Sequence, residues 1–267
     1  MIKQEIETSE NIISKLKKFR NYIHLNRQSL QAKILNKSKF SIDFQREKEF
    51  LATIENNVFK NLKELKIIDF YYVESMEDDV FKDLVDVENL FLLRTDEIER
   101  TNDADGRRLK IKSNVDIMKI INTLKNLKSL SLHGWAIDSI TADYFKSFSN
   151  LNELYLTDNK FNVLVETMFT GLDNLELLNL EDNDINDIQP FTFRSLKKLK
   201  DLTLSNNHLK TLNENVFYGL ENLKHLYVCS NLISKINKNV FIYLTKLENL
   251  FLDSNGKFFL SLFNLIY

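Results

Sequence analysis

Hydrophobic residues recur with a fixed period along the second half of the chain. Six segments begin at Leu127 and at every twenty-fourth residue after it, the last of them at Leu247. In the segment that begins at Leu151, leucine occupies repeat positions 1, 4, 6 and 22, asparagine position 9, apolar residues positions 11 and 14, and phenylalanine position 19. The next three segments keep every one of these positions, with valine once in place of leucine. The chain is therefore built from a repeated structural unit.

The same pattern continues toward the N-terminus in weaker form. The unit at Leu127 has Trp135 where asparagine is expected. The unit that begins at Val87 is much longer than the others because it contains an insertion, and the unit that begins at Leu65 is slightly shorter. A still weaker unit precedes them, with Ile42 and Phe44 in its expected strand. We count about nine units in all.

The spacing of the apolar positions predicts the structure of each unit. Positions 4 and 6 are two residues apart, so their side chains share one face of an extended strand. Strands of successive units are expected to pair as a parallel sheet, while positions 11, 14, 19 and 22 complete the core from a return segment made of turns or single helical turns. No unit can bury its own apolar side, so stability requires stacking. The asparagine at position 9 is expected to satisfy backbone groups of its own turn and of the neighbouring unit.

Three regions follow from this pattern. Residues 1–39 form a basic leader, because residues 1–40 hold nine lysines and arginines against three glutamates. Apolar residues at helical spacing predict an amphipathic helix over 7–23, which either caps the first unit or lies on a membrane surface. Residues 40–257 form the repeat region, with an insertion near 94–120, and residues 258–267 form a short apolar tail. The chain ends within its last unit without a polar cap, as expected of a fragment or of a tail that folds over the open end.

Composition and charge exclude several classes of site. The formal net charge is −2, which favours neither nucleic-acid nor membrane binding. The single cysteine, Cys229, excludes an internal disulfide and a cysteine-based zinc site. We find no secretory signal, no apolar run long enough for a transmembrane helix, no metal-ligand spacing among the four histidines and no phosphate-binding loop. The sequence therefore predicts a protein that is not an enzyme and needs no cofactor.

The repeat resembles the leucine-rich-repeat family, in particular its 24-residue subfamily with the pattern LxxLxLxxNxLxxLxxxxFxxLxx. The resemblance implies an α/β repeat fold, a horseshoe-shaped solenoid with a parallel β-sheet on its concave side and a mostly irregular or short-helical convex side. Members of this subfamily are mostly animal extracellular proteins, such as Toll-like receptors, insect leucine-rich immune proteins and chaoptin-like proteins. The resemblance implies recognition of a protein, or of a glycan, in immunity, adhesion or signalling. The chain lacks the cysteine-rich caps of these members, so an intracellular adaptor is the alternative.

The repeat register also predicts which residues face a partner. Positions 5, 7 and 8 are expected to lie on the concave face, where tyrosines flank an acidic patch of Asp158, Glu181 and Asp182. This arrangement is typical of a surface that docks a basic element of a protein partner, although an ordinary solvated sheet face would have the same pattern. The candidate partner-binding residues are Phe91, Arg94, His133, Tyr155, Asp158, Asn179, Glu181, Asp182, Thr203, Tyr227 and Phe251.

Overall fold

The computed structural model describes residues 31–36, 39–43, 52–54, 67–71, 73–94, 117–142 and 144–256. The chain forms two compact units, residues 1–124 and residues 125–267. The helix predicted over 7–23, most of the insertion near 94–120 and the apolar tail lie outside the described residues.

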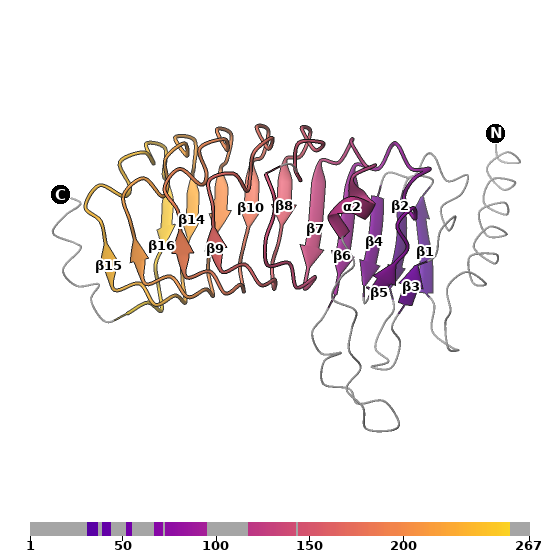
Figure 1. The fold of residues 1–267 in the computed structure, drawn as a ribbon, viewed down its shortest axis with the longest axis horizontal. Helices are drawn as coiled ribbons and strands as arrows, with labels where there is room; N and C mark the ends of the chain where they lie inside the picture. Colours follow the sequence, from indigo (N-terminus) through magenta and orange to yellow (C-terminus); the bar gives the residue numbers. More distant parts are fainter. Residues whose placement is uncertain are drawn as a thin grey trace, which may run out of the picture. The chain divides into compact units, whose positions relative to one another are not determined.

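The first unit contains a parallel arrangement of strands with one antiparallel neighbour (Figure 1). Strands β2, β4 and β6 pair in parallel, β1 pairs with β2 in the antiparallel sense, and β3 pairs in parallel with β5. The bounds are Gln31–Asn36 for β1, Lys39–Asp43 for β2, Ala52–Ile54 for β3, Ile67–Tyr71 for β4, Val73–Met76 for β5, Asn89–Leu93 for β6 and Ile117–Ile121 for the short helix α2.

Strand β1 lies within the leader of residues 1–39, where the sequence predicted a helix over 7–23 and no strand. The pairing of β1 with β2 supplies hydrogen-bond partners to one edge of β2, which would otherwise remain open. An antiparallel neighbour needs only a short connection, whereas a parallel one needs a crossover. The repeat pattern carries no information about such a strand, because the strand belongs to no repeat.

The second unit is a solenoid whose main sheet has one parallel strand from each coil (Figure 1). Residues at the same repeat position pair across the sheet, so that Leu178 lies between Leu154 and Leu202. Repeat positions 4 and 6 are buried in every coil except the last one described. The bounds are Ser129–His133 for β7, Glu153–Tyr155 for β8, Leu177–Asn179 for β10, Asp201–Thr203 for β12, His225–Tyr227 for β14 and Asn249–Phe251 for β16.

The return segments of the second unit form single turns, as predicted, but they also contain short strands. Turns such as that closed by the Leu196 N–H and the Phe193 carbonyl recur at positions 19 and 22. Two parallel pairs of two-residue strands were not expected. They form because the constant repeat length holds equivalent backbones of adjacent coils at hydrogen-bonding distance, with position 14 directed inward. The pairs are β9 (Val163–Leu164) with β11 (Asp187–Ile188), and β13 (Thr211–Leu212) with β15 (Lys235–Ile236).

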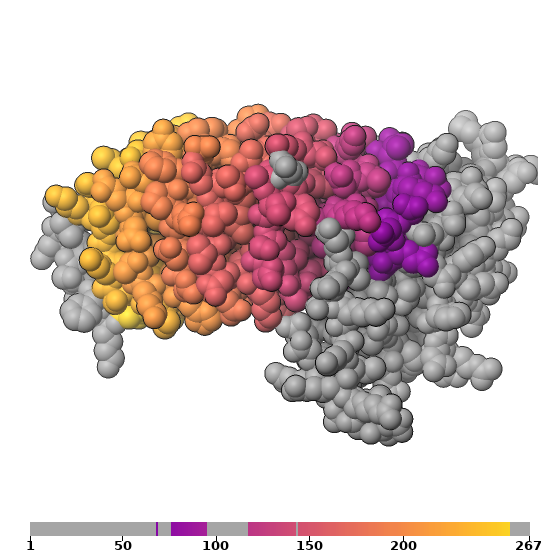
Figure 2. Space-filling model, viewed as in Figure 1, coloured from indigo at the N-terminus to yellow at the C-terminus, as the bar shows by residue number. Residues whose placement is uncertain are grey.

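The phenylalanines at position 19 stack on one another between coils. The rings of Phe169 and Phe193 are 5.8 Å apart and those of Phe217 and Phe241 are 6.2 Å apart, in both cases close to parallel. The first three of these rings are fully buried. Figure 2 shows the coils of the second unit following one another in chain order along the surface.

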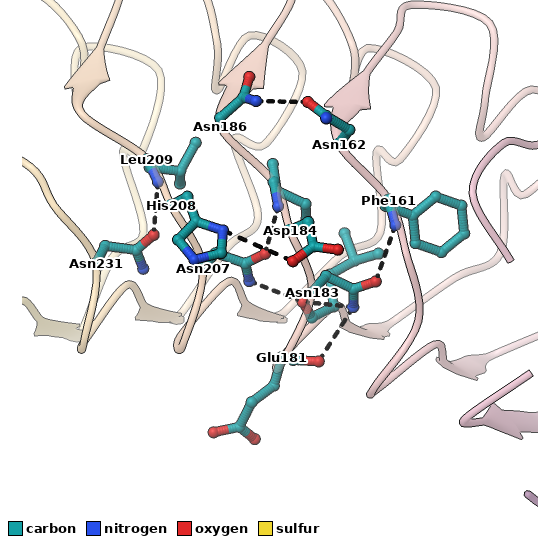
Figure 3. Close-up of polar contacts among 12 residues, drawn as sticks. Phe161, Asn162, Glu181, Asn183, Asp184, Asn186, Asn207, His208, Leu209 and Asn231 are labelled. Carbon is teal, nitrogen blue, oxygen red and sulfur yellow. Dashed lines mark hydrogen bonds and ion pairs between the residues drawn. The ribbon is translucent and has the colours of Figure 1, made fainter. Parts of the chain in front are cut away.

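From the coil that begins at Leu151 onward, the asparagine at position 9 connects each coil of the second unit to the preceding one. Asn207 donates its side-chain amide to the carbonyls of Leu180 in the preceding coil and of Leu204 and Ser205 in its own coil. Its side-chain oxygen accepts the N–H of Ile185 in the preceding coil. The equivalent bonds of Asn183 and Asn231 are visible in Figure 3. The prediction for position 9 is therefore confirmed.

Candidate functional site

One face of the main sheet in the second unit is available for binding. Positions 4 and 6 point into the core, so positions 3, 5 and 7 of each coil project to the other side, followed by position 8 at the turn. We call the residues at positions 3, 5, 7 and 8 of the second unit the sheet face. In coil order, they are Ser129, Ser131, His133, Gly134; Glu153, Tyr155, Thr157, Asp158; Leu177, Asn179, Glu181, Asp182; Asp201, Thr203, Ser205, Asn206; His225, Tyr227, Cys229, Ser230; and Asn249, Phe251, Asp253, Ser254.

The sheet face is acidic. It carries the carboxylates of Glu153, Asp158, Glu181, Asp182, Asp201 and Asp253 and contains no lysine or arginine. Two of the lysines at the neighbouring position 2 are paired with glutamates of adjacent coils, because Lys200 lies 2.7 Å from Glu176 and Lys224 lies 2.7 Å from Glu248. The sheet face therefore presents negative potential to a partner.

The residues of the predicted acidic patch have different surroundings. Partial burial, followed by the charge of Asp182, raises the pKa of Glu181. The Glu181 carboxylate also accepts a hydrogen bond from the Asn206 amide at 3.3 Å. His133 lies 3.7 Å from Asp158, so a protonated histidine would partly neutralise that carboxylate.

The residue types at position 8 are limited by the backbone conformation as well as by exposure to solvent. Every described residue at this position in the second unit has a positive φ, between 51° and 71°, and each is glycine, aspartate, asparagine or serine. Short polar side chains and glycine are the types that occupy this left-handed region most readily. Asp158 and Asp182 therefore have a structural reason for being aspartate in addition to any role in binding.

Aromatic residues at position 5 lie at both ends of the acidic region. Burial, followed by the charge and the hydrogen bond of Glu153 and then the charge of Asp201, raises the pKa of Tyr155. The rings of Tyr227 and Phe251 are stacked in parallel at 4.7 Å. Between Tyr155 and Tyr227, position 5 holds the smaller side chains Asn179 and Thr203, which pair with each other across β10 and β12. The Asn179 side chain accepts the Glu181 N–H at 2.9 Å and so has a local structural role.

Two of the predicted residues lie outside the second unit. Phe91 and Arg94 lie in the first compact unit. Arg94 is only 6% exposed, whereas the repeat register predicted a solvent-facing side chain. It follows β6 at the start of the insertion, where the regular repeat spacing no longer applies, so the register could not predict its orientation.

The prediction missed the residues at position 3. Glu153, Leu177 and Asp201 lie on adjacent strands and share the face of position 5. The signal was present in the sequence, because positions 3, 5 and 7 alternate with the buried positions 4 and 6. Their inclusion adds two carboxylates to the acidic surface.

The described part of the chain contains no group of histidine, cysteine and carboxylate side chains arranged to hold a metal ion. Within the same residues, no helix is long and apolar enough to cross a membrane. His225 and Cys229 interact with different groups: the Nδ1 of His225 lies 2.8 Å from the Asn249 amide, and the sulfur of Cys229 lies 4.0 Å from Asp253.

Comparisons with known families identify the repeat along most of the chain. A family model for the leucine rich repeat matches residues 125–185, 174–231 and 213–256. A second model, for the BspA type leucine rich repeat region, matches residues 8–102. No curated protein sequence matches the chain.

Three solved structures show the same fold. TLR13 in complex with ssRNA13 is 27% identical, with a TM-score of 0.61, over 79% of this chain and 30% of that chain. Drosophila Toll in complex with Spatzle is 20% identical, with a TM-score of 0.58, over 76% and 30% of the two chains. A leucine-rich-repeat protein of Leptospira interrogans is 28% identical, with a TM-score of 0.57, over 75% and 46%. The present chain spans less than half the length of each of them.

Proposed function

Because the chain belongs to the leucine-rich-repeat family, we propose that it is a non-catalytic recognition scaffold whose sheet face docks a basic element of a protein partner. The observation that carries the proposal is the charge of that face: six carboxylates project from it, and it has no lysine or arginine. Tyrosines beside the carboxylates add amphipathic contact area of the kind that is enriched at protein interfaces.

The same charge favours a protein partner over a nucleic acid. TLR13 is described in complex with an RNA and Toll in complex with Spatzle, so the fold accommodates both classes of ligand. Nucleic-acid affinity arises mainly from lysines and arginines that contact phosphates. Phosphates would be repelled by Glu153, Glu181 and Asp201, which lie on three adjacent coils.

The proposal includes a secreted or cell-surface location with a role in immunity, adhesion or signalling. It is supported by the resemblance of the repeat to a subfamily whose members are mostly extracellular. Fractionation of cells that make the protein, followed by mass spectrometry of its peptides, tests the location. We expect the peptides in the medium or membrane fraction, and their confinement to the cytosol would refute this part of the proposal.

Selection of ligands from a random peptide library displayed on phage tests the binding mode. We expect the purified protein to enrich peptides rich in lysine and arginine, and fluorescence anisotropy to show that their affinity decreases as salt is raised. In the double variant Glu181→Gln/Asp182→Asn, the affinity is expected to fall by about tenfold, since each lost charge near an interface contributes about 0.5–1 kcal/mol.

Two features of this design separate binding from folding. Asparagine at residue 182 retains the left-handed backbone conformation, so the variant loses charge without added strain. The matched control is Asp173→Asn/Glu214→Gln, which removes one aspartate and one glutamate that are exposed on return segments. Enrichment of neutral or acidic peptides, or equal losses of affinity in the two double variants, would overturn the proposal.

A further inference from the structure

An apolar side chain lies between two carboxylates at position 3 of the sheet face. Leu177 on β10 pairs with Glu153 on β8 and with Asp201 on β12. Because adjacent strands are about 4.8 Å apart, the Cα atoms of the two acidic residues are about 10 Å apart with Leu177 midway. Leu177 is half-buried, so part of its side chain remains available for contact.

Tyr155 adds an aromatic ring beside this arrangement. Its hydroxyl donates to Glu153 Oε2 at 3.4 Å. Both Glu153 and Asp201 contribute to raising its pKa, so the hydroxyl lies in the field of both carboxylates. The position-5 neighbour of Tyr155 on β10 is Asn179, whose short side chain is engaged with the Glu181 backbone.

Neither carboxylate is neutralised within the described part of the chain by a lysine or arginine in an ion pair. Glu153 accepts hydrogen bonds from two neutral hydroxyls, those of Ser129 and Tyr155. His225 lies beside Asp201, with its Nε2 4.0 Å away. Lys224, which forms its ion pair with Glu248, also lies within the field of Asp201. The Nδ1 of His225 is held on the other side by the Asn249 side-chain amide, 2.8 Å away.

We propose that the partner's basic element presents an arginine here, with its methylene stem on Leu177 and its guanidinium group between Glu153 and Asp201 beside the Tyr155 ring. This inference rests on the proposed function, because it names the side chain that the sheet face recognises. A guanidinium group has five donors in a planar fork, so it can engage two separated carboxylates and stack on an aromatic ring. The compact ammonium group of lysine fits one carboxylate at a time.

Two matched peptides test the inference with the full chain. One is a fluorescein-labelled octapeptide of alternating glycine and arginine, and the other has lysine at every arginine position. We expect the arginine peptide to bind about fivefold more tightly in anisotropy titrations, as a cation–π contact and a second charged hydrogen bond would provide. Asp201→Asn, and separately Glu153→Gln, are expected to abolish this preference.

Asp253→Asn is the matched control, because Asp253 belongs to the sheet face but lies two coils beyond Asp201. It is expected to weaken both peptides slightly and to leave the arginine preference intact. If both peptides bind equally and the sheet-face variants weaken both, the proposed function stands and the arginine site is refuted. If neither peptide binds, or if Asp201→Asn and Asp253→Asn have the same effect, the arginine site is refuted as well. Absence of binding would also contradict docking of a basic element.

Discussion

At the scale of single residues, the asparagine at position 9 joins neighbouring coils of the second unit through its side-chain amide. Its amide group satisfies carbonyls of two successive coils, and its oxygen accepts an N–H from the earlier coil. A side chain with both donors and an acceptor is required there, which explains why asparagine recurs. In the coil that begins at Leu127, the equivalent residue is Trp135, which is buried.

The variant Asn207→Ala measures how much the hydrogen bonds of a position-9 asparagine contribute to the free energy of unfolding. It removes the acceptor of the Ile185 N–H and one of the two asparagine donors to each of the carbonyls of Leu180 and Leu204, so we expect a loss of about 2 kcal/mol in the free energy of unfolding. Asn183 and Asn231 remain as the second donors to these carbonyls. Urea denaturation followed by circular dichroism gives the value. Asn186→Ala is the control, because Asn186 is an exposed asparagine bonded to Asn162 (Figure 3). It should cost no more than about 0.5 kcal/mol. Equal losses would show that the buried bonds are not what stabilises the coils.

At the scale of the element, glycine marks the places where return segments approach each other most closely. Gly219 has a φ of +97°, and a Cβ added to it would lie 2.6 Å from the Cα of Arg194 in the preceding coil. Gly171 has a similar φ of +94°, but its nearest neighbour would be the Cα of Lys146 at 3.1 Å. Backbone strain is therefore alike at the two residues, while the steric conflict is larger at Gly219.

The two alanine variants separate strain from steric conflict. We expect Gly219→Ala to lower the free energy of unfolding by about 2–3 kcal/mol, and Gly171→Ala to lower it by about half as much. Thermal unfolding monitored by circular dichroism compares them directly. A larger loss for Gly171→Ala would contradict the packing described between the coils that contain Gly219 and Arg194.

The strands of the second unit could be predicted from the sequence because leucine, or once valine, recurs at positions 4 and 6 of every coil. Leucine at positions 4 and 6 can be buried only if the residues between them face outward. The paired strands β9 with β11 and β13 with β15 could not be predicted, since backbone atoms make their bonds and any side chain at position 13 permits them. The antiparallel strand β1 and the burial of Arg94 were missed for another reason, because both lie where the repeat does not hold.

The candidate site was predicted in part. The acidic and aromatic character of positions 5, 7 and 8 was visible in the sequence, but the left-handed backbone of position 8 was not. The role of Leu177 depends on two neighbours that occupy the same repeat position in the coils on either side, so it becomes visible only when adjacent coils are compared.

At the scale of the whole molecule, a repeat protein distributes its stability over neighbouring coils, so a change on the sheet face acts locally. The charge of the face is a property of several coils together. Glu181 contributes to it with a pKa that is raised by partial burial and by Asp182. The folded protein therefore disfavours the charged form of Glu181. Protonation of this carboxylate stabilises the folded state as the pH falls through the pKa that Glu181 has in the folded protein.

Binding of a basic peptide should show the opposite dependence on pH. When the pH is lowered, Glu181 takes up a proton before an ordinary glutamate does because its pKa is raised, so the affinity for the arginine peptide is expected to fall. Anisotropy titrations at several pH values measure this, with Glu181→Gln as the comparison. The variant should bind more weakly at neutral pH and lose less affinity on acidification. A pH dependence unchanged by the substitution would show that another group is responsible.

The left-handed turn at position 8 has a consequence for how this surface can evolve. Glycine, aspartate, asparagine and serine, the four residue types found there, can each be encoded by a codon with two purines followed by a pyrimidine. Single-base changes within that block interconvert aspartate with asparagine or glycine, and serine with asparagine or glycine. A gene can therefore add or remove a negative charge by one nucleotide substitution on the coils whose position 8 holds aspartate, asparagine or a glycine encoded within that block, without leaving the set of residues already found in this turn. New ligand preferences are accessible in this way while the solenoid stays folded.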